Sequence, residues 1–211
     1  MSKYNTDITV VLDRSGSMDS IRGDTIGGFN TFLEDQKGVT GKARLTLVQF
    51  DDKYEVVYDN IELDSAPALT EQTFIPRGST ALLDAMGRTI VDTGSRLSSL
   101  SEEDRPDNVI FVIVTDGHEN ASREFTASSV FDMVKHQTEN YSWNFVYLGA
   151  NQDAIAVGAS LGIRRGSSIS YSATAAGTSS SYNSTSSLVK DLRTGATSAS
   201  FSAIDRKNAS L

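Results

Sequence analysis

Residues 7–18 read Asp-Ile-Thr-Val-Val-Leu-Asp-Arg-Ser-Gly-Ser-Met. The run from Ile8 to Leu12 is apolar or β-branched, which predicts a buried strand, and it ends abruptly at Asp13. Two hydroxyl side chains, Ser15 and Ser17, follow at alternate positions before a helix-like segment begins. A carboxylate and two hydroxyls at the end of a strand form an oxygen-rich corner, and such a corner suits a small divalent cation.

The composition limits the class of protein. The chain has 211 residues, 38% of them hydrophobic, which is enough for one domain with a core. Its formal net charge is −8 and its pI about 4.7, a balance that argues against nucleic-acid and anionic-membrane partners and favours a cation. It contains no cysteine, so thiolate metal sites and cysteine nucleophiles are excluded. We expect a cytoplasmic protein without a signal segment or membrane span.

Strands and helices are expected to alternate along the chain. The short link at Asp51–Lys53 forces the strand at 54–58 to pair antiparallel with its predecessor, at an edge of the sheet. The fold class is therefore α/β: a doubly wound, mostly parallel, Rossmann-like sheet of about six strands with one antiparallel edge strand and helices on both faces. Further strands are expected at residues 44–50, 109–115, 143–148 and 167–171.

We expect one domain over residues 1–195, followed by a weakly ordered tail over 196–211. Between Gly166 and Ala203, 18 of 38 residues are Ser or Thr, a composition compatible with disorder. However, Leu188, Val189 and Leu192 have helical spacing, which favours a packed helix near 183–194.

Three segments should meet at the carboxyl edge of this sheet, where open α/β sheets bind ligands. Asp13 and Asp116 each end an apolar strand, and Thr80 precedes the clearest amphipathic helix. The alternative for the first segment is a turn that caps the next helix, with Asp19 and Ser20 at its start, and a hydroxyl such as that of Thr80 is also an expected helix cap.

The motifs resemble those of von Willebrand factor type A (VWA) domains, particularly the intracellular bacterial or phage type. Asp13-Arg-Ser-Gly-Ser17 is similar to their Asp-x-Ser-x-Ser motif, Gly78-Ser-Thr-Ala-Leu82 to their threonine loop, and Thr115-Asp-Gly117 to their aspartate loop. The resemblance covers roughly residues 7–195.

This resemblance implies a metal-ion-dependent adhesion site (MIDAS). Its ligands would be Asp13, Ser15, Ser17, Thr80 and Asp116, and its ion would be Mg²⁺, with Mn²⁺ and Ca²⁺ as alternatives. The implied partner is a protein that presents an Asp or Glu carboxylate to the ion, and no enzymatic activity is implied.

Other polar and aromatic residues received less specific interpretations. We expect His118 to be a solvated loop residue and Glu119 to act at a helix start. Arg14, at the variable motif position, is expected in a surface salt bridge, and Asp51 in a turn. Phe131 is expected in the core.

Two other functions compete with metal-dependent protein binding. A metal-dependent hydrolase is one, because a bound ion can activate water, but the sequence shows no general base paired with a nucleophile and no phosphate-binding loop. The second is a structural or virion assembly component that uses the fold as a scaffold.

Overall fold

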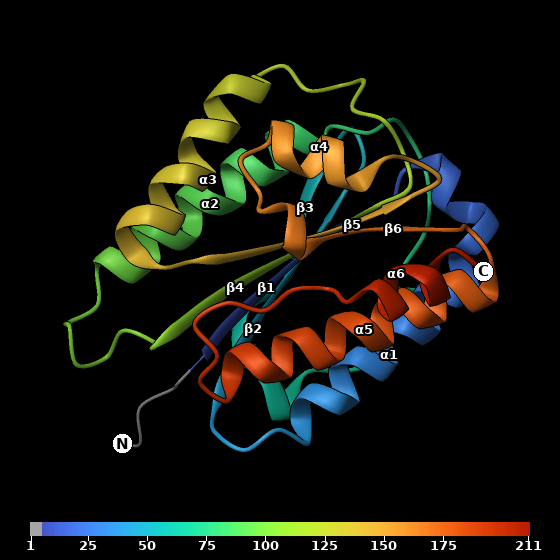
Figure 1. Ribbon diagram of the computed structural model, residues 1–211. Coiled ribbons are helices and arrows are strands. Elements are labelled where there is room, and N and C mark those ends of the chain that lie inside the picture. The colour runs from blue at the N-terminus through green and yellow to red at the C-terminus, as the bar shows by residue number, and fades with distance from the viewer. Residues whose placement is uncertain (1–5) are drawn as a thin grey trace.

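The computed structural model describes residues 6–211 of the chain, which form a six-stranded sheet in the order β3-β2-β1-β4-β5-β6 (Figure 1). All neighbouring pairs are parallel except β2 and β3, so the predicted mixed sheet and its antiparallel edge strand are confirmed. The strands are β1 (Thr6–Asp13), β2 (Ala43–Phe50), β3 (Tyr54–Glu62), β4 (Asn108–Thr115), β5 (Asn144–Ala150) and β6 (Ser168–Tyr171).

Helices cover both faces of the sheet. In Figure 1, α1 and α5 lie on the lower face, while α2, α3 and α4 lie on the upper face. Each face has its own cluster of buried apolar side chains, because the central strands alternate their side chains between the two helix layers. The helices are α1 (Arg22–Lys37), α2 (Leu82–Ser98), α3 (Ala127–Tyr141), α4 (Ala154–Ser160), α5 (Ala175–Arg193) and α6 (Ala203–Ala209).

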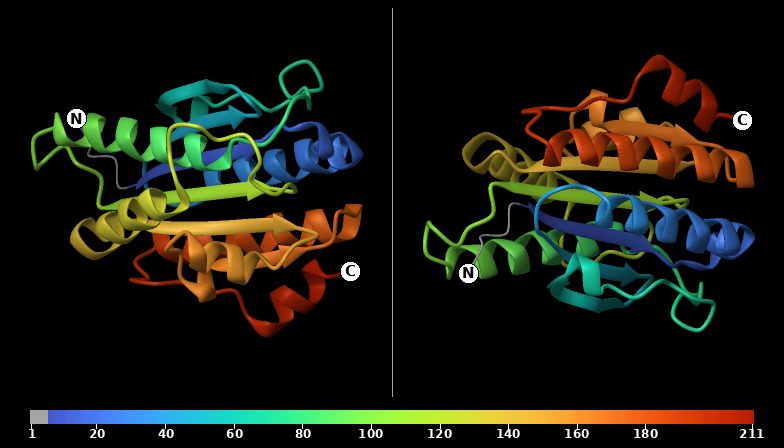
Figure 2. Two further views of the ribbon diagram at one scale, coloured as in Figure 1. Left: turned by 90° about the horizontal axis from the view of Figure 1, so that it is seen from above. Right: turned by 90° about the horizontal axis from the view of Figure 1, so that it is seen from below.

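The strand order reverses at β1, and the proposed metal ligands lie at the carboxyl ends of the strands around this point. From β1 the chain proceeds to β2 on one side and later returns to β4 on the other, so β1 lies at the centre. The register pairs Asp13 with Phe50 and Leu12 with Val114, which brings the ends of these three strands level. Figure 2 shows the parallel strands pointing toward the same edge.

The Ser/Thr-rich segment forms a longer helix than expected. Helix α5 begins at Ala175, where the Thr174 side chain accepts a hydrogen bond from the Gly177 amide, and four of its ten buried residues are Ser or Thr. It packs closely on α1, since a Cβ at Gly28 would lie 2.3 Å from the Tyr182 ring. Gly28 of α1 therefore makes room for the Tyr182 ring of α5, a contact that composition alone could not show.

Helix α6 is a finding that the sequence reading missed. It begins with a capping box in which Ser202 and Asp205 exchange hydrogen bonds, and Ala209 accepts a hydrogen bond from the Ser172 amide beside β6. Arg206 also donates to the carbonyl of Ser168 at 2.6 Å. Only seven residues long, the helix carries too little periodic apolar pattern to be predicted locally.

Two local predictions were wrong. Asp19 and Ser20 do not cap α1: a 3₁₀ turn, Gly16–Ile21, comes first and leads directly into the helix. Phe131 was expected in the core, but it is 36% exposed, because α3 presents Val130 and Val134 to the sheet instead.

Candidate metal site

Strand β1 delivers Asp13 to the carboxyl edge as a fully buried carboxylate. Its Oδ1 accepts a hydrogen bond from the Ser15 amide at 2.6 Å, and its Oδ2 accepts one from the Thr115 hydroxyl at 2.6 Å. Burial raises the pKa of Asp13 to about 6, although both hydrogen bonds lower it; the charge of Asp116 raises it slightly further. Asp13 is thus a rigidly held carboxylate that receives only neutral donors from these partners.

Three further oxygens form a chain beside it. The hydroxyls of Ser15 and Ser17 are 3.2 Å apart, and the Ser17 hydroxyl donates to Asp116 Oδ1 at 2.6 Å. Burial also raises the pKa of Asp116, against the lowering effect of the Ser17 hydrogen bond. The structure therefore brings residues that are 99 positions apart in sequence into direct contact, as the position of the two strand ends predicted.

Thr80 reaches the same place from the loop before α2. A Cβ on Gly117 would lie 2.9 Å from the Thr80 hydroxyl oxygen and 3.6 Å from that of Ser17, so Gly117 leaves space between these groups. Asn120 fixes the Thr80 backbone. Its side-chain oxygen accepts a hydrogen bond from the Thr80 backbone amide at 2.9 Å, and its backbone amide donates one to the Thr80 carbonyl at 3.0 Å. Asn120 was not found from sequence, because it belongs to none of the motifs.

Capping does not explain Thr80. Helix α2 has Ala81 at its N-cap position and shows no side-chain capping hydrogen bond. The capping role that the sequence left open for the Thr80 hydroxyl is therefore not what the structure shows.

The oxygens of Ser15, Ser17 and Asp116 have the spacing and the chemistry that suit a small hard cation. Mg²⁺ binds oxygen at about 2.0–2.1 Å in an octahedron, which puts neighbouring ligands about 2.9 Å apart. The separations of 3.2 Å (Ser15 to Ser17) and 2.6 Å (Ser17 to Asp116) bracket that value. Within residues 6–211 no group of three or more His, Cys, Asp or Glu is placed to hold a metal, so a site here depends on hydroxyls.

Glu119 and His118 behave as the sequence suggested. Glu119 accepts hydrogen bonds from the amides of Leu83, Ala121 and Ser122, at the start of α2 and in its own loop. His118 is exposed. The loop that carries Asp116 is thus shaped by Glu119 rather than by the histidine.

Arg14 is not in a surface salt bridge: its side chain is 7% exposed. Its Nε donates to Asp51 Oδ2 at 3.1 Å, and its Nη1 to Glu55 at 2.6 Å. Asp51 is fully buried and also accepts from Arg77 Nε at 2.8 Å. Burial alone would raise the pKa of Asp51, but the bonds from Arg77 and the Lys53 amide, with the charge of Arg14, hold it below its usual range. Asp51, expected to be a plain turn residue, is therefore a buried ionic centre that no local pattern could reveal.

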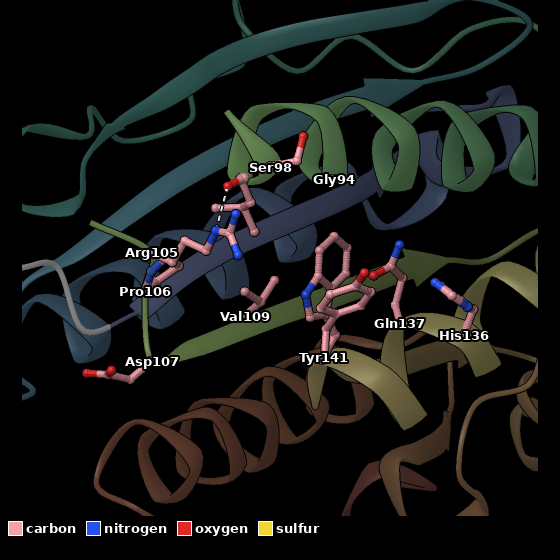
Figure 3. A pocket seen from close by; sticks show the side chains of 11 residues that line it. Gly94, Ser98, Arg105, Pro106, Asp107, Val109, His136, Gln137 and Tyr141 are labelled. Carbon is pink, nitrogen blue, oxygen red and sulfur yellow. Dashed lines mark hydrogen bonds between the residues drawn. The ribbon is translucent and has the colours of Figure 1, made fainter. Parts of the chain in front are cut away.

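A separate cavity lies away from this edge. It has a volume of about 320 Å³ and is lined by the last turns of α2 and α3 and by the starts of β4 and β5. Figure 3 shows Tyr141, Gln137 and His136 of α3 opposite Gly94 and Ser98 of α2. None of the five expected metal ligands lines it.

Solved structures similar in fold come from several sources. Proximal thread matrix protein 1 from the mussel byssus, in a structure with a zinc-occupied MIDAS motif, matches with a TM-score of 0.63 and 15% identity over 90% of this chain and 48% of that chain. The vWF domain of the type V pili tip protein Mfa5 from Porphyromonas gingivalis matches with a TM-score of 0.61 and 11% identity, over 90% and 96% of the two chains. A von Willebrand factor type A protein from Catenulispora acidiphila gives a TM-score of 0.57 and 13% identity, over 90% and 43%.

These likenesses define the fold, which is that of VWA domains. No family model and no curated protein matches the sequence. The chain spans less than half of the byssus protein, so nothing of that whole protein's role transfers with the fold. No helix among the described residues has the length and apolar character needed to cross a membrane.

Proposed function

We propose that this chain is a protein-binding module whose binding depends on a divalent cation. Asp13, Ser15, Ser17, Thr80 and Asp116 would hold the ion. The observation that carries the proposal is the contact of the Ser15, Ser17 and Asp116 oxygens at spacings suited to Mg²⁺, with Gly117 leaving space between Ser17 and Thr80. The zinc-occupied MIDAS of the byssus protein, which has the same fold, supports a divalent ion at this edge.

The charges of the site favour a partner carboxylate. Ser15, Ser17 and Thr80 contribute neutral oxygens, so two carboxylates are the only negative groups among the five proposed ligands. A bound Mg²⁺ would supply an electrophilic coordination position to an incoming Asp or Glu. The residues of this chain would fix the ion and leave that position to the partner.

We further propose that the site is not catalytic. Both Asp13 oxygens already accept hydrogen bonds, from Ser15 and Thr115, so Asp13 is held as an anchor rather than presented as a base. A cytoplasmic location and a bacterial or phage source remain predictions of the sequence.

Calorimetric titration with MgCl₂ and MnCl₂ tests metal binding. The Thr80→Ala variant should lose affinity by about tenfold or more, since a direct ligand is removed. The matched control is Ser98→Ala, an exposed hydroxyl at the other end of α2, which should bind like the wild type. Absence of binding by the wild type at millimolar metal would contradict the proposal.

The partner is tested with a short peptide that contains one Asp, titrated in Mg²⁺ or in chelator, beside the same peptide with Asn. We expect Mg²⁺-dependent binding of the Asp peptide alone. Equal binding of both peptides in chelator would contradict a carboxylate–metal contact. Turnover of a generic phosphoester that disappears in Asp116→Ala would instead support a hydrolase.

A further inference from the structure

Residue Arg14 occupies the middle position between two proposed ligands, Asp13 and Ser15, yet its side chain is directed to Asp51. An arginine at this position is unexpected, because a guanidinium that faced the proposed ligands would repel a bound cation. Asp51 and Glu55 both accept from Arg14, so its charge is compensated away from the proposed ligands. The pairing with Asp51 is completely buried on the carboxylate side.

Asp51 also anchors the loop that carries Thr80. Arg77 donates from Nε to Asp51 Oδ2 at 2.8 Å, and the Ala81 amide donates to the Asp51 carbonyl at 3.0 Å. These two residues stand on either side of Thr80 in the sequence. The position of Thr80 is therefore bracketed by two contacts to the same residue.

The turn that carries Asp51 is itself fixed. The Lys53 amide donates to Asp51 Oδ1 at 2.6 Å, and the Asp51 amide donates to the Lys53 carbonyl at 3.0 Å. Both carboxylate oxygens of Asp51 thus accept hydrogen bonds, and the carboxylate cannot rotate without breaking bonds to two arginines and an amide.

Backbone contacts join the two ligand loops directly above this centre. Arg77 donates its amide to the Arg14 carbonyl at 2.7 Å, and Gly16 donates to the Gly78 carbonyl at 3.2 Å. Gly78 has φ +69, and a Cβ there would lie 2.2 Å from Asp52 Oδ1, so the loop passes too close to the turn for a side chain. The relative position of the two ligand loops therefore depends on the Asp51–Lys53 turn against which they pack.

We propose that Asp51 is a positioning residue for the metal site: through Arg14 and Arg77 it fixes the Ser15–Ser17 loop against the Thr80 loop and compensates the charges of the two guanidiniums. The inference rests on the proposed function. Removal of the Asp51 charge would leave Arg14 without its buried carboxylate partner, with Glu55 alone remaining, and would free the Thr80 loop, so metal affinity should fall although no ligand is changed.

The test compares Asp51→Asn with Asp7→Asn by calorimetric titration of MnCl₂. Asp7 is a matched control, because it is also a buried, arginine-paired aspartate: it is 3% exposed, lies near the start of β1, away from the proposed ligands, and is paired with Arg96. Titrations are run well below the unfolding temperature of the less stable variant. We expect about tenfold weaker Mn²⁺ binding for Asp51→Asn and binding within about twofold of wild type for Asp7→Asn.

A second variant covers the case in which Asp51→Asn does not fold. Arg77→Gln changes a side chain that is 51% exposed, so the fold should tolerate it, and Mn²⁺ affinity should fall by a smaller factor of about three. In the double variant with Asp51→Asn, Arg77→Gln should add no further loss, because both act through one contact. A purely structural role would give additive losses of stability and unchanged metal affinity.

The outcomes separate the two proposals. If the wild type binds no Mn²⁺, the proposed function fails and this inference with it. If the wild type binds Mn²⁺ and the Asp51 and Arg77 variants bind equally well, only the positioning role is overturned. The same holds if Asp7→Asn weakens binding as much as Asp51→Asn does.

Discussion

Strand β1 carries a buried aspartate at each end, and the two are satisfied in different ways. Asp7, at the start, receives two hydrogen bonds from the guanidinium of Arg96, at 2.8 and 3.1 Å. Asp13, at the end, receives one amide and one hydroxyl, and the described residues place no cationic side chain in a salt bridge with it. A buried carboxylate normally has a cation beside it. Asp7 therefore belongs to the framework, whereas Asp13 has no ion-pair partner among the described residues, which is consistent with the metal site proposed above.

The neighbourhoods of the two ends follow the same division. Around Asp13, loops bring hydroxyls together, and the nearest arginine of the motif is turned toward Asp51. Around Asp7, a helix side chain closes the pair directly. An ion pair made within the fold is complete as the chain folds, so only the other end can respond to added metal.

The largest effect should come from Asp13→Ala. Loss of the central carboxylate should weaken Mg²⁺ binding by about 100-fold or more, since it anchors both the Ser15 amide and the ion. Calorimetric titration gives the measurement, and Asp7→Asn serves as the control at the other end. If the two substitutions weakened binding equally, the distinction between the ends of β1 would be lost.

Arg96→Gln should lower the stability of the protein and leave its Mg²⁺ affinity unchanged. It leaves the buried carboxylate of Asp7 without its cation, which should lower the free energy of unfolding by about 2 to 3 kcal/mol. Urea unfolding followed by the fluorescence of Trp143, the single tryptophan, measures this loss. An accompanying fall in Mg²⁺ affinity would show that the two ends are coupled.

The metal-free protein should become more stable as the pH falls from 7 toward 4. The folded-state pKa of Asp13 is raised, so its favourable contribution is complete below its unfolded pKa and is lost as pH rises through about 6. A shift from 3.8 to about 6 sets an upper limit of about 3 kcal/mol. Unfolding in urea across this pH window measures the gain, and saturating Mg²⁺ should abolish it. A metal-free protein whose stability did not change over this window would contradict the assignment.

Gly117→Ala should have a smaller effect, confined to the metal site. The added methyl group would lie 2.9 Å from the Thr80 hydroxyl oxygen, so Mg²⁺ affinity should fall by about tenfold, or about 1.4 kcal/mol. Gly27→Ala in α1 is the control: beyond the helix's own neighbouring backbone, no atom lies within 4 Å of its added methyl, and helix propensity should raise stability by about 1 kcal/mol. Unchanged affinity in Gly117→Ala would mean that Thr80 and Ser17 do not bind the same ion.

Much of this architecture could be predicted locally. Apolar runs that end in a carboxylate, short links and helical spacing are patterns of neighbouring residues, and they were sufficient for the mixed sheet and its antiparallel edge. The same patterns predicted that Asp13, Ser15, Ser17, Thr80 and Asp116 would converge, because parallel strands present their carboxyl ends at one edge. Their role as metal ligands remains a prediction.

The tertiary structure alone decided how that edge is supported. No local sequence pattern predicts the bonds of Asp51 to Arg14 and Arg77, which lie 37 and 26 residues away in the sequence. Asn120 holds Thr80 across 40 residues in the same way. Sequence patterns record which residues face the core or end a strand, whereas the pairing of buried polar groups depends on which loops the finished fold brings side by side.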